Sequence, residues 1–412
     1  MTFNALHKAL GLEPRPLDFS MINDAVERQV AESPDLDWKR CLPMDTQKPD
    51  WKNEFAKDVA AMANSGGGVI VFGVEEEKAV ASRIVSTGGI SDAQERTLRS
   101  IAFSAIHPPV LGARFTPVTD GTDTVVVLHV PASPDAPHLI YKGDYFAAPL
   151  RDGSRTDWMK EKLLENAYRL RLDGRSQRTA ELERLLEYSG GSASERVWMV
   201  AAALPLNPRP AGLGALSVEL AREIFKSARK RRFVFAERGS WSPFDSIDGL
   251  NPRPGLRRWV DRTQAHLLPS TSKREVTAEV HHNGAVTLAG SVGGFLSREE
   301  SDSSHVHPSD LEGFVADFMA LASSTAREAG LDGTYQIAVS LKWDGAAPMY
   351  IRIPDQSGYL LDTTYGTPIR RFENIYSEFD SGSSDETLLE TVRQTALDVV
   401  NQGGAQYLRE IN

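Results

Sequence analysis

The sequence predicts an α/β (α+β) protein, with a mixed-sheet first domain followed by a second α+β domain. One observation is a helical period at 51–64 between an alternating stretch that starts at Asp35 and an apolar run at 69–74. Another is the Ser/Gly-rich segment 189–194, whose composition is typical of a flexible linker. A third is the Asn-Gly pair 283–284, which indicates a β-hairpin in the second half. Two folded halves therefore flank a short linker.

Length and composition agree with this organisation. The chain has 412 residues, of which 41% are hydrophobic and 25% charged, as in ordinary globular proteins. Cys41 is the only cysteine, which excludes an internal disulfide and a cysteine-rich zinc site. The start lacks the pattern of a signal peptide, and the apolar runs are shorter than the ~20 residues of a membrane helix. We therefore expect a cytoplasmic protein without a membrane partner.

The first domain is predicted to cover residues 1–188. Ser20 is a plausible N-cap of a helix over 19–31, and Asp50 of the helix over 51–64. In the strand from Asp35, alternation places Leu36 and Trp38 on one face and Asp37 and Lys39 on the other. The buried strand at 69–74 completes a strand, helix, strand unit. Its predicted core comprises Leu36, Trp38, Phe55, Val59, Met62, Ile70 and Phe72.

Further elements are expected after position 120. A buried strand is predicted at 124–130, and two strands between 139 and 150 are joined by a turn at Lys142-Gly143-Asp144. Residues 151–154 are expected to lead into a long helix capped by Thr156. The linker 189–194 then begins the second half.

The second domain, 195–412, is predicted to mix strands and helices without a visible repeat or helix-turn-helix. Ser309 and Glu312 have the spacing of a capping box for a helix that continues to Ala329. The other expected elements are strands at 197–204, 335–343 and 349–353, helices at 216–231 and 384–402, and a hairpin at 275–292.

Three separated motifs resemble the Schlafen/AlbA-type domain, which is also described as a divergent AAA domain. They are Glu32 to Lys39 (ESPDLDWK), Asn64 to Glu75 (NSGGGVIVFGVE) and Arg151 to Thr156 (RDGSRT). The resemblance covers roughly residues 20–172. It implies a nucleic-acid-binding fold, and some members are ribonucleases that cleave tRNA or rRNA with three carboxylates.

The resemblance assigns those three carboxylates to Glu32, Asp37 and Glu75. Asp37 stands where Glu is usual, Glu75 where Asp is usual, and Trp38 where Phe is usual. Converging carboxylates can hold Mg²⁺ or Mn²⁺ for hydrolysis, with Lys39 facing the scissile phosphate. The alternative is that Glu32 ends a helix, Asp37 and Lys39 form a solvated strand face, and Glu75 starts a charged loop.

The glycines at 66–68 do not form a phosphate-binding loop of the Walker type. They follow a helix instead of preceding one, and the Lys-Ser or Lys-Thr pair is missing. A helix C-cap and a tight turn account for them. We therefore expect no ATP.

The net charge is −10, so a nucleic-acid site must be a local basic patch. The first candidates are Lys39, Arg151 and Arg155, with Ser154 and Thr156 beside the two arginines, where a helix N-terminus would attract phosphate. The reserve candidates are Arg229, Lys230, Arg231 and Arg232. An ordinary capped helix and ordinary helix-end cations are the respective alternatives.

Two functional hypotheses follow. The first is a nucleic-acid-binding protein, with RNA favoured over DNA, that acts as a metal-dependent endoribonuclease on tRNA or other structured RNA in stress or phage defence. The second is a non-catalytic DNA-binding transcriptional regulator or a ligand-sensing assembly module. We also expect a homo-oligomer, because sites of larger relatives are formed by two related lobes and this chain shows one.

Overall fold

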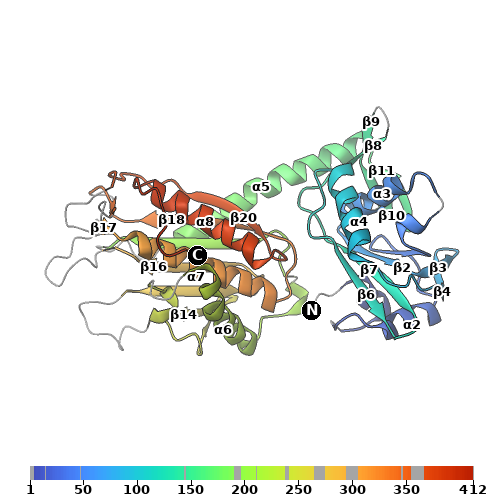
Figure 1. The fold of residues 1–412 in the computed structure, drawn as a ribbon, viewed down its shortest axis with the longest axis horizontal. Coiled ribbons are helices and arrows are strands. Elements are labelled where there is room, and N and C mark those ends of the chain that lie inside the picture. Colours follow the sequence, from blue (N-terminus) through green and yellow to red (C-terminus); the bar gives the residue numbers. More distant parts are fainter. Residues whose placement is uncertain are drawn as a thin grey trace. The chain divides into compact units, whose positions relative to one another are not determined.

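The computed structural model describes residues 4–13, 15–46, 48–142, 145–189, 196–209, 211–236, 241–263, 274–293, 305–344, 347–353 and 366–411. The chain divides into two compact units, Met1–Ser176 and Gln177–Asn412 (Figure 1). The division falls inside helix α5 (Glu161–Ser189), ahead of the boundary predicted at position 188. Residues 190–194 of the predicted linker lie outside the described residues.

A mixed four-stranded sheet forms the centre of the first unit. Its order is β1 (Leu36–Lys39), β2 (Gly68–Phe72), β7 (Thr124–Val130) and β6 (Arg114–Thr119), of which the last three are labelled in Figure 1. Strands β1 and β2 are parallel and are connected through α3 (Trp51–Asn64), whereas the other pairs are antiparallel. This is the predicted strand, helix, strand unit.

Side chains fill both faces of that sheet. One cluster lies on the side of α3 and α4 (Asp92–Ala105), and the other on the side of α1 (Ala5–Leu10) and α2 (Phe19–Glu27). Leu36 and Trp38 face the second side, so Asp37 and Lys39 face α3. All seven predicted core residues are buried, with at most 4% of each exposed. The predicted core of this unit is confirmed.

Three small β elements surround the sheet. They are the hairpin β3 (Val74–Glu77) and β4 (Val80–Ile84), the sheet β5 (Ile106–His107), β8 (Leu139–Lys142) and β9 (Tyr145–Ala147), and the hairpin β10 (Pro149–Asp152) and β11 (Arg155–Trp158). The predicted turn residues 143 and 144 lie outside the described residues.

The predicted helix start at Thr156 is wrong. Arg151 pairs with Thr156 and Asp152 with Arg155 in an antiparallel hairpin, so this stretch turns back as strand. Gly153, with φ +61°, supplies the left-handed residue that the tight turn needs. Helix α5 starts only at Glu161. The cap of α2 also differs, since Asp18 and not Ser20 accepts the amide of Met21.

The second unit is built on a seven-stranded antiparallel sheet. Helices α6 (Val218–Phe235), α7 (Pro308–Glu328) and α8 (Asp385–Asn401) contribute to the cluster on one face, and the last turns of α5 cover part of the other. The strand order is β13 (Arg253–Gly255), β14 (Arg258–Arg262), β15 (Val276–His281), β16 (Val286–Ser291), β12 (Trp198–Pro205), β18 (Thr334–Lys342) and β20 (Ile375–Asp380). A short pair joins β17 (His305–Val306) to β19 (Tyr350–Ile351).

The predicted Asn-Gly hairpin is present as β15 and β16. The predicted capping box is wrong, because α7 begins after His307 and no side chain caps it. The Glu312 side chain instead accepts the backbone amides of Arg409 and Glu410 at 2.8 and 2.7 Å. No helix among the described residues has the length and apolarity needed to cross a membrane.

Candidate nucleic-acid interface

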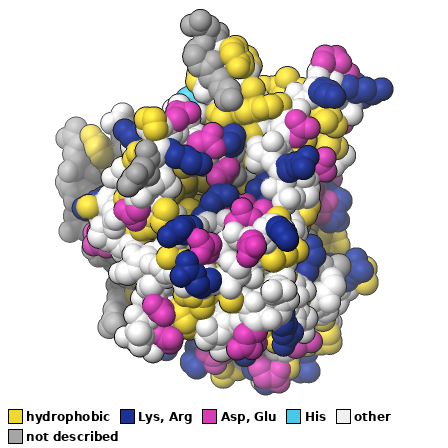
Figure 2. Space-filling model, turned by 90° about the vertical axis from the view of Figure 1, so that its right-hand side faces the viewer, with side chains coloured by type: hydrophobic (Ala, Val, Ile, Leu, Met, Phe, Trp, Pro, Cys, Tyr) yellow, Lys and Arg dark blue, Asp and Glu magenta, His cyan; other side chains and the backbone are white. Residues whose placement is uncertain are grey.

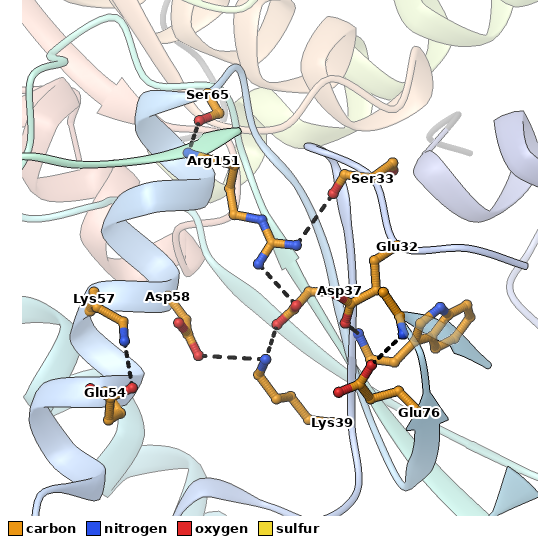
Figure 3. A network of polar contacts seen from close by, with 12 residues as sticks. Glu32, Ser33, Asp37, Lys39, Glu54, Lys57, Asp58, Ser65, Glu76 and Arg151 are labelled. Carbon is orange, nitrogen blue, oxygen red and sulfur yellow. Dashed lines mark hydrogen bonds and ion pairs between the residues drawn. The ribbon is translucent and has the colours of Figure 1, made fainter. Parts of the chain in front are cut away.

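A buried ion pair joins Asp37 of β1 to Arg151 of β10. Arg151 Nη1 donates to Asp37 Oδ1 at 2.9 Å, and only 3% and 2% of the two side chains are exposed. The backbone amide of Arg151 donates to Ser65 Oγ at 2.8 Å, and Arg151 Nη2 donates to the Ser33 carbonyl at 3.4 Å (Figure 3). Arg151 therefore holds the end of α3 and the β1 segment together.

Lys39 lies between two carboxylates at the outer side of this pair. Its Nζ is 2.5 Å from Asp37 Oδ2 and 3.9 Å from Asp58 Oδ2 of α3 (Figure 3). Burial alone would lower the pKa of Lys39, but Asp37 and then Asp58 outweigh it and raise this pKa. Burial raises the pKa of Asp58 to about 6, against the opposing effect of Lys39. The ammonium stays charged, and 36% of the Lys39 side chain is exposed.

Glu32 lies beside Asp37 on the neighbouring segment. Its Oε1 accepts the amide of Trp38 at 3.1 Å. Burial and then the negative charge of Asp37 together raise the pKa of Glu32 to about 7. Glu32 therefore takes up a proton near neutral pH.

Glu75 belongs to a different set of contacts. Its Oε1 is 3.0 Å from Arg40 Nη1, and its Oε2 is 2.6 Å from Arg83 Nη2. Hydrogen bonds from Arg83 lower the pKa of Glu75. The two arginine side chains are 64% and 66% exposed. Glu75 is therefore a half-buried anion between two exposed cations.

The donor set predicted for Mg²⁺ or Mn²⁺ does not fit a divalent ion in this arrangement. Both oxygens of Asp37 already face cationic groups, Lys39 and Arg151, and Glu75 is held by two others. Among the residues that the structure describes, no three His, Cys, Asp or Glu side chains are grouped to hold a metal ion. Of the three predicted carboxylates, the structure brings Glu32 and Asp37 together.

The first candidates for phosphate binding on the β10–β11 hairpin differ in their exposure to solvent. Arg151 is a buried structural residue, whereas Arg155 and Ser154 are exposed and Thr156 is half-buried. Because these residues lie on the two strands and the turn of a β-hairpin and not at a helix N-terminus, the helix-dipole argument for them is wrong.

Most of the reserve candidates are engaged inside the second unit. Arg232 Nε is 2.7 Å from the buried Asp317, and Arg231 Nη2 is 2.5 Å from Asp385. Arg229 donates to the carbonyl of Ile247, and Lys230 is exposed. The expectation that this run forms one exposed basic patch is therefore wrong.

Sequence reasoning missed Asp58, Arg40 and Arg83. Asp58 carried a signal, since it lies three residues after Phe55 and four before Met62 on the inward stripe of its helix. A carboxylate on such a stripe is buried and needs a partner. Arg83 follows no recognised motif, and only the β3 and β4 pairing brings it to Glu75.

Comparison with known proteins identifies the first unit. The model of the family described as "Schlafen, AlbA_2" matches residues 32–160. The first unit is therefore similar to this family over the matched residues. Glu32, Asp37, Lys39, Asp58, Glu75 and Arg151 all lie within the matched residues.

Two solved structures are similar in part. The DIP2311 protein from Corynebacterium diphtheriae is 16% identical, with 54% of this chain and 39% of that chain covered and a TM-score of 0.26. The N-terminal domain of a protein related to the ATP-dependent DNA helicase RecG, from Nitrosomonas europaea, is 25% identical, with coverages of 30% and 80% and a TM-score of 0.23. The search of curated proteins gave no match.

Proposed function

We propose that the Schlafen/AlbA_2 domain binds nucleic acid, RNA in preference to DNA, and that Lys39, Arg40 and Arg83 contact its phosphates. The match of residues 32–160 to this family carries the proposal, since the family's fold is a nucleic-acid-binding one. The three cations come from neighbouring segments, β1, the residue after it and β4.

Exposure distinguishes these cations from Arg151. Arg40 and Arg83 are about two-thirds exposed and share a single carboxylate, so the three groups together carry one positive charge. A phosphate can replace Glu75 between the two guanidinium groups, which suit planar, bidentate anions. Figure 2 shows cationic and anionic side chains mixed on this face of the molecule, in keeping with a local and not a global basic surface.

The test is fluorescence anisotropy with labelled RNA and DNA of one sequence, from about 50 to 200 mM salt. The variant is Arg40→Ala with Arg83→Ala, which we expect to weaken binding and to reduce the salt slope by about 1–2. Arg169→Ala with Arg184→Ala is the matched control, because these arginines are 64% and 60% exposed and each is paired with a glutamate on α5. Equal effects of the two double variants would reject the proposed site.

RNA cleavage is a second proposal, and Glu32 favours it. A carboxyl with a pKa of about 7 can take up and release a proton at neutral pH, as general acid–base cleavage requires. The cation of Lys39, 2.5 Å from Asp37, can stabilise a phosphate that approaches the pair.

Purified protein incubated with total tRNA, with EDTA or with Mn²⁺, tests this activity. Glu32→Gln and Glu32→Ala should abolish cleavage that is catalysed here, and Arg155→Ala should not. Cleavage that survives both Glu32 variants would assign it to a contaminant or another site. Binding without cleavage would favour the non-catalytic regulator.

A further inference from the structure

A group of aromatic side chains lies exposed on the small sheet of β5, β8 and β9. Tyr141 is 61% and Phe146 57% exposed, and they pair directly across the β8 and β9 hairpin. With His107 and Leu139 they line an open pocket of about 240 Å³. Neither the core of the first unit nor the interface proposed above uses them.

Successive side chains of β8 alternate between the core and the exposed face of the hairpin. Ile140, between Leu139 and Tyr141, is 3% exposed and belongs to the core. Tyr141 points to the other face, where its ring meets His107 edge-on at 6.0 Å and Phe146 at 6.3 Å with an interplanar angle of 69°. Edge contacts of this kind leave ring faces open to solvent.

A buried histidine and two arginines paired with Asp135 lie close in sequence or contact to the start of β8. His138, the residue before Leu139, holds the Pro108 carbonyl at 2.7 Å next to His107. Arg171 and Arg175 of α5 reach Asp135, three residues earlier, at 3.4 and 2.6 Å. The Arg175 side chain is half exposed. The described residues that line the pocket, His107, Leu139, Tyr141 and Phe146, carry no carboxylate.

We propose that this aromatic pocket binds an unstacked base of single-stranded nucleic acid, a step that rests on the nucleic-acid binding proposed above. Bases stack on exposed aromatic side chains without regard to sequence, while nearby cations follow the phosphates. The pocket is smaller than the roughly 300–1,000 Å³ of drug-sized sites, which suits one planar ring system. Bases inside a duplex cannot reach it.

An apolar protein partner is the competing occupant, and the ring chemistry favours the base. The described lining residues number four, three of them with rings, and form a much smaller surface than the roughly 800 Å² that each partner buries in a stable protein interface.

The experiment compares full-length wild type with Phe146→Ala, Phe146→Leu and Tyr141→Ala, using a labelled oligo-U 12-mer and a duplex RNA of the same length. Each alanine variant should weaken oligo-U binding by about 5- to 150-fold and leave duplex binding and the salt slope unchanged. Phe146→Leu keeps an apolar side chain but removes the ring, so it should lose affinity as well. Tyr407→Ala, 80% exposed in the second unit, is the control.

The outcomes separate the two proposals. Wild-type binding that all three pocket variants retain would overturn the aromatic pocket and leave the nucleic-acid proposal standing. Wild type that binds neither probe would reject the nucleic-acid proposal. If Phe146→Leu binds as wild type and the alanine variants change only the sedimentation of the protein, the pocket is an interface between copies, which also overturns the inference. Circular dichroism confirms the fold of each variant.

Discussion

Arg151→Met should destabilise the first unit strongly, because it removes one partner of a buried ion pair. Only 2% of the Asp37 side chain is exposed, and losing one member of such a pair costs about 3–5 kcal/mol. Lys39 remains 2.5 Å from the other oxygen of Asp37, so we expect the lower end, about 3 kcal/mol. At 2–4 °C per kcal/mol for a unit of this size, the melting temperature should fall by about 6–12 °C.

Urea denaturation of the full chain, followed by circular dichroism, measures this loss. Arg155→Met is the matched control, since Arg155 is exposed on the same hairpin and should change stability by less than about 0.5 kcal/mol. Asp37→Asn combined with Arg151→Met should recover part of the loss, because no buried carboxylate is then left without its arginine. A loss below about 1 kcal/mol for Arg151→Met, or one equal to that of Arg155→Met, would refute a structural role for this pair.

Four further predictions concern separate parts of the chain. The pKa of Glu32 is raised from its ordinary 4.5 to about 7, so the contribution of the protonated carboxyl to stability is present below pH ~4.5 and is lost as the pH rises to 7. In urea titrations at pH 8, Glu32→Gln should therefore be about 1 kcal/mol more stable than wild type, after discounting for solvent. At pH 4 the two proteins should be equally stable. Asp317→Asn should lower the free energy of unfolding by about 3 kcal/mol, because this fully buried carboxylate accepts hydrogen bonds from Arg232, Ser242 and the Phe244 amide. A substitution of an exposed residue that binds phosphate would instead change the affinity for RNA. Gly284→Ala should lower the melting temperature more than Gly121→Ala, although both glycines have positive φ. A Cβ atom at position 284 would lie 2.2 Å from a methyl group of Leu331, whereas a Cβ atom at position 121 would meet nothing within 4 Å. Self-association stays a prediction, and sedimentation at micromolar concentration should show a species larger than 45.3 kDa; a 45.3 kDa species alone would contradict it.

The parts of the fold that could be predicted are those in which local pattern and burial agree. The alternation around Leu36 and Trp38, the helical period of α3 and the apolar run of β2 each define a buried face, and the structure buries those faces. The Asn-Gly hairpin could also be predicted from the sequence, because its turn fixes the register of both strands. The hairpin at 151–158 could not be predicted, since its polar strands show no hydrophobic alternation and Thr156 suits a helix cap as well as a strand.

The candidate site depended on contacts between segments far apart in the chain. The sequence pattern placed Asp37 and Lys39 on one strand face, which is correct. It could not show that Arg151, 114 positions further along the chain, forms an ion pair with Asp37. Once both oxygens of Asp37 face cations, its carboxylate is committed to the fold, and burial of the neighbouring Glu32 holds a proton near neutral pH instead of favouring a metal ion. The same three motif positions therefore differ in their surroundings: Asp37 joins strand β1 to the β10–β11 hairpin, Glu32 has a raised pKa, and Glu75 lies between two exposed arginines.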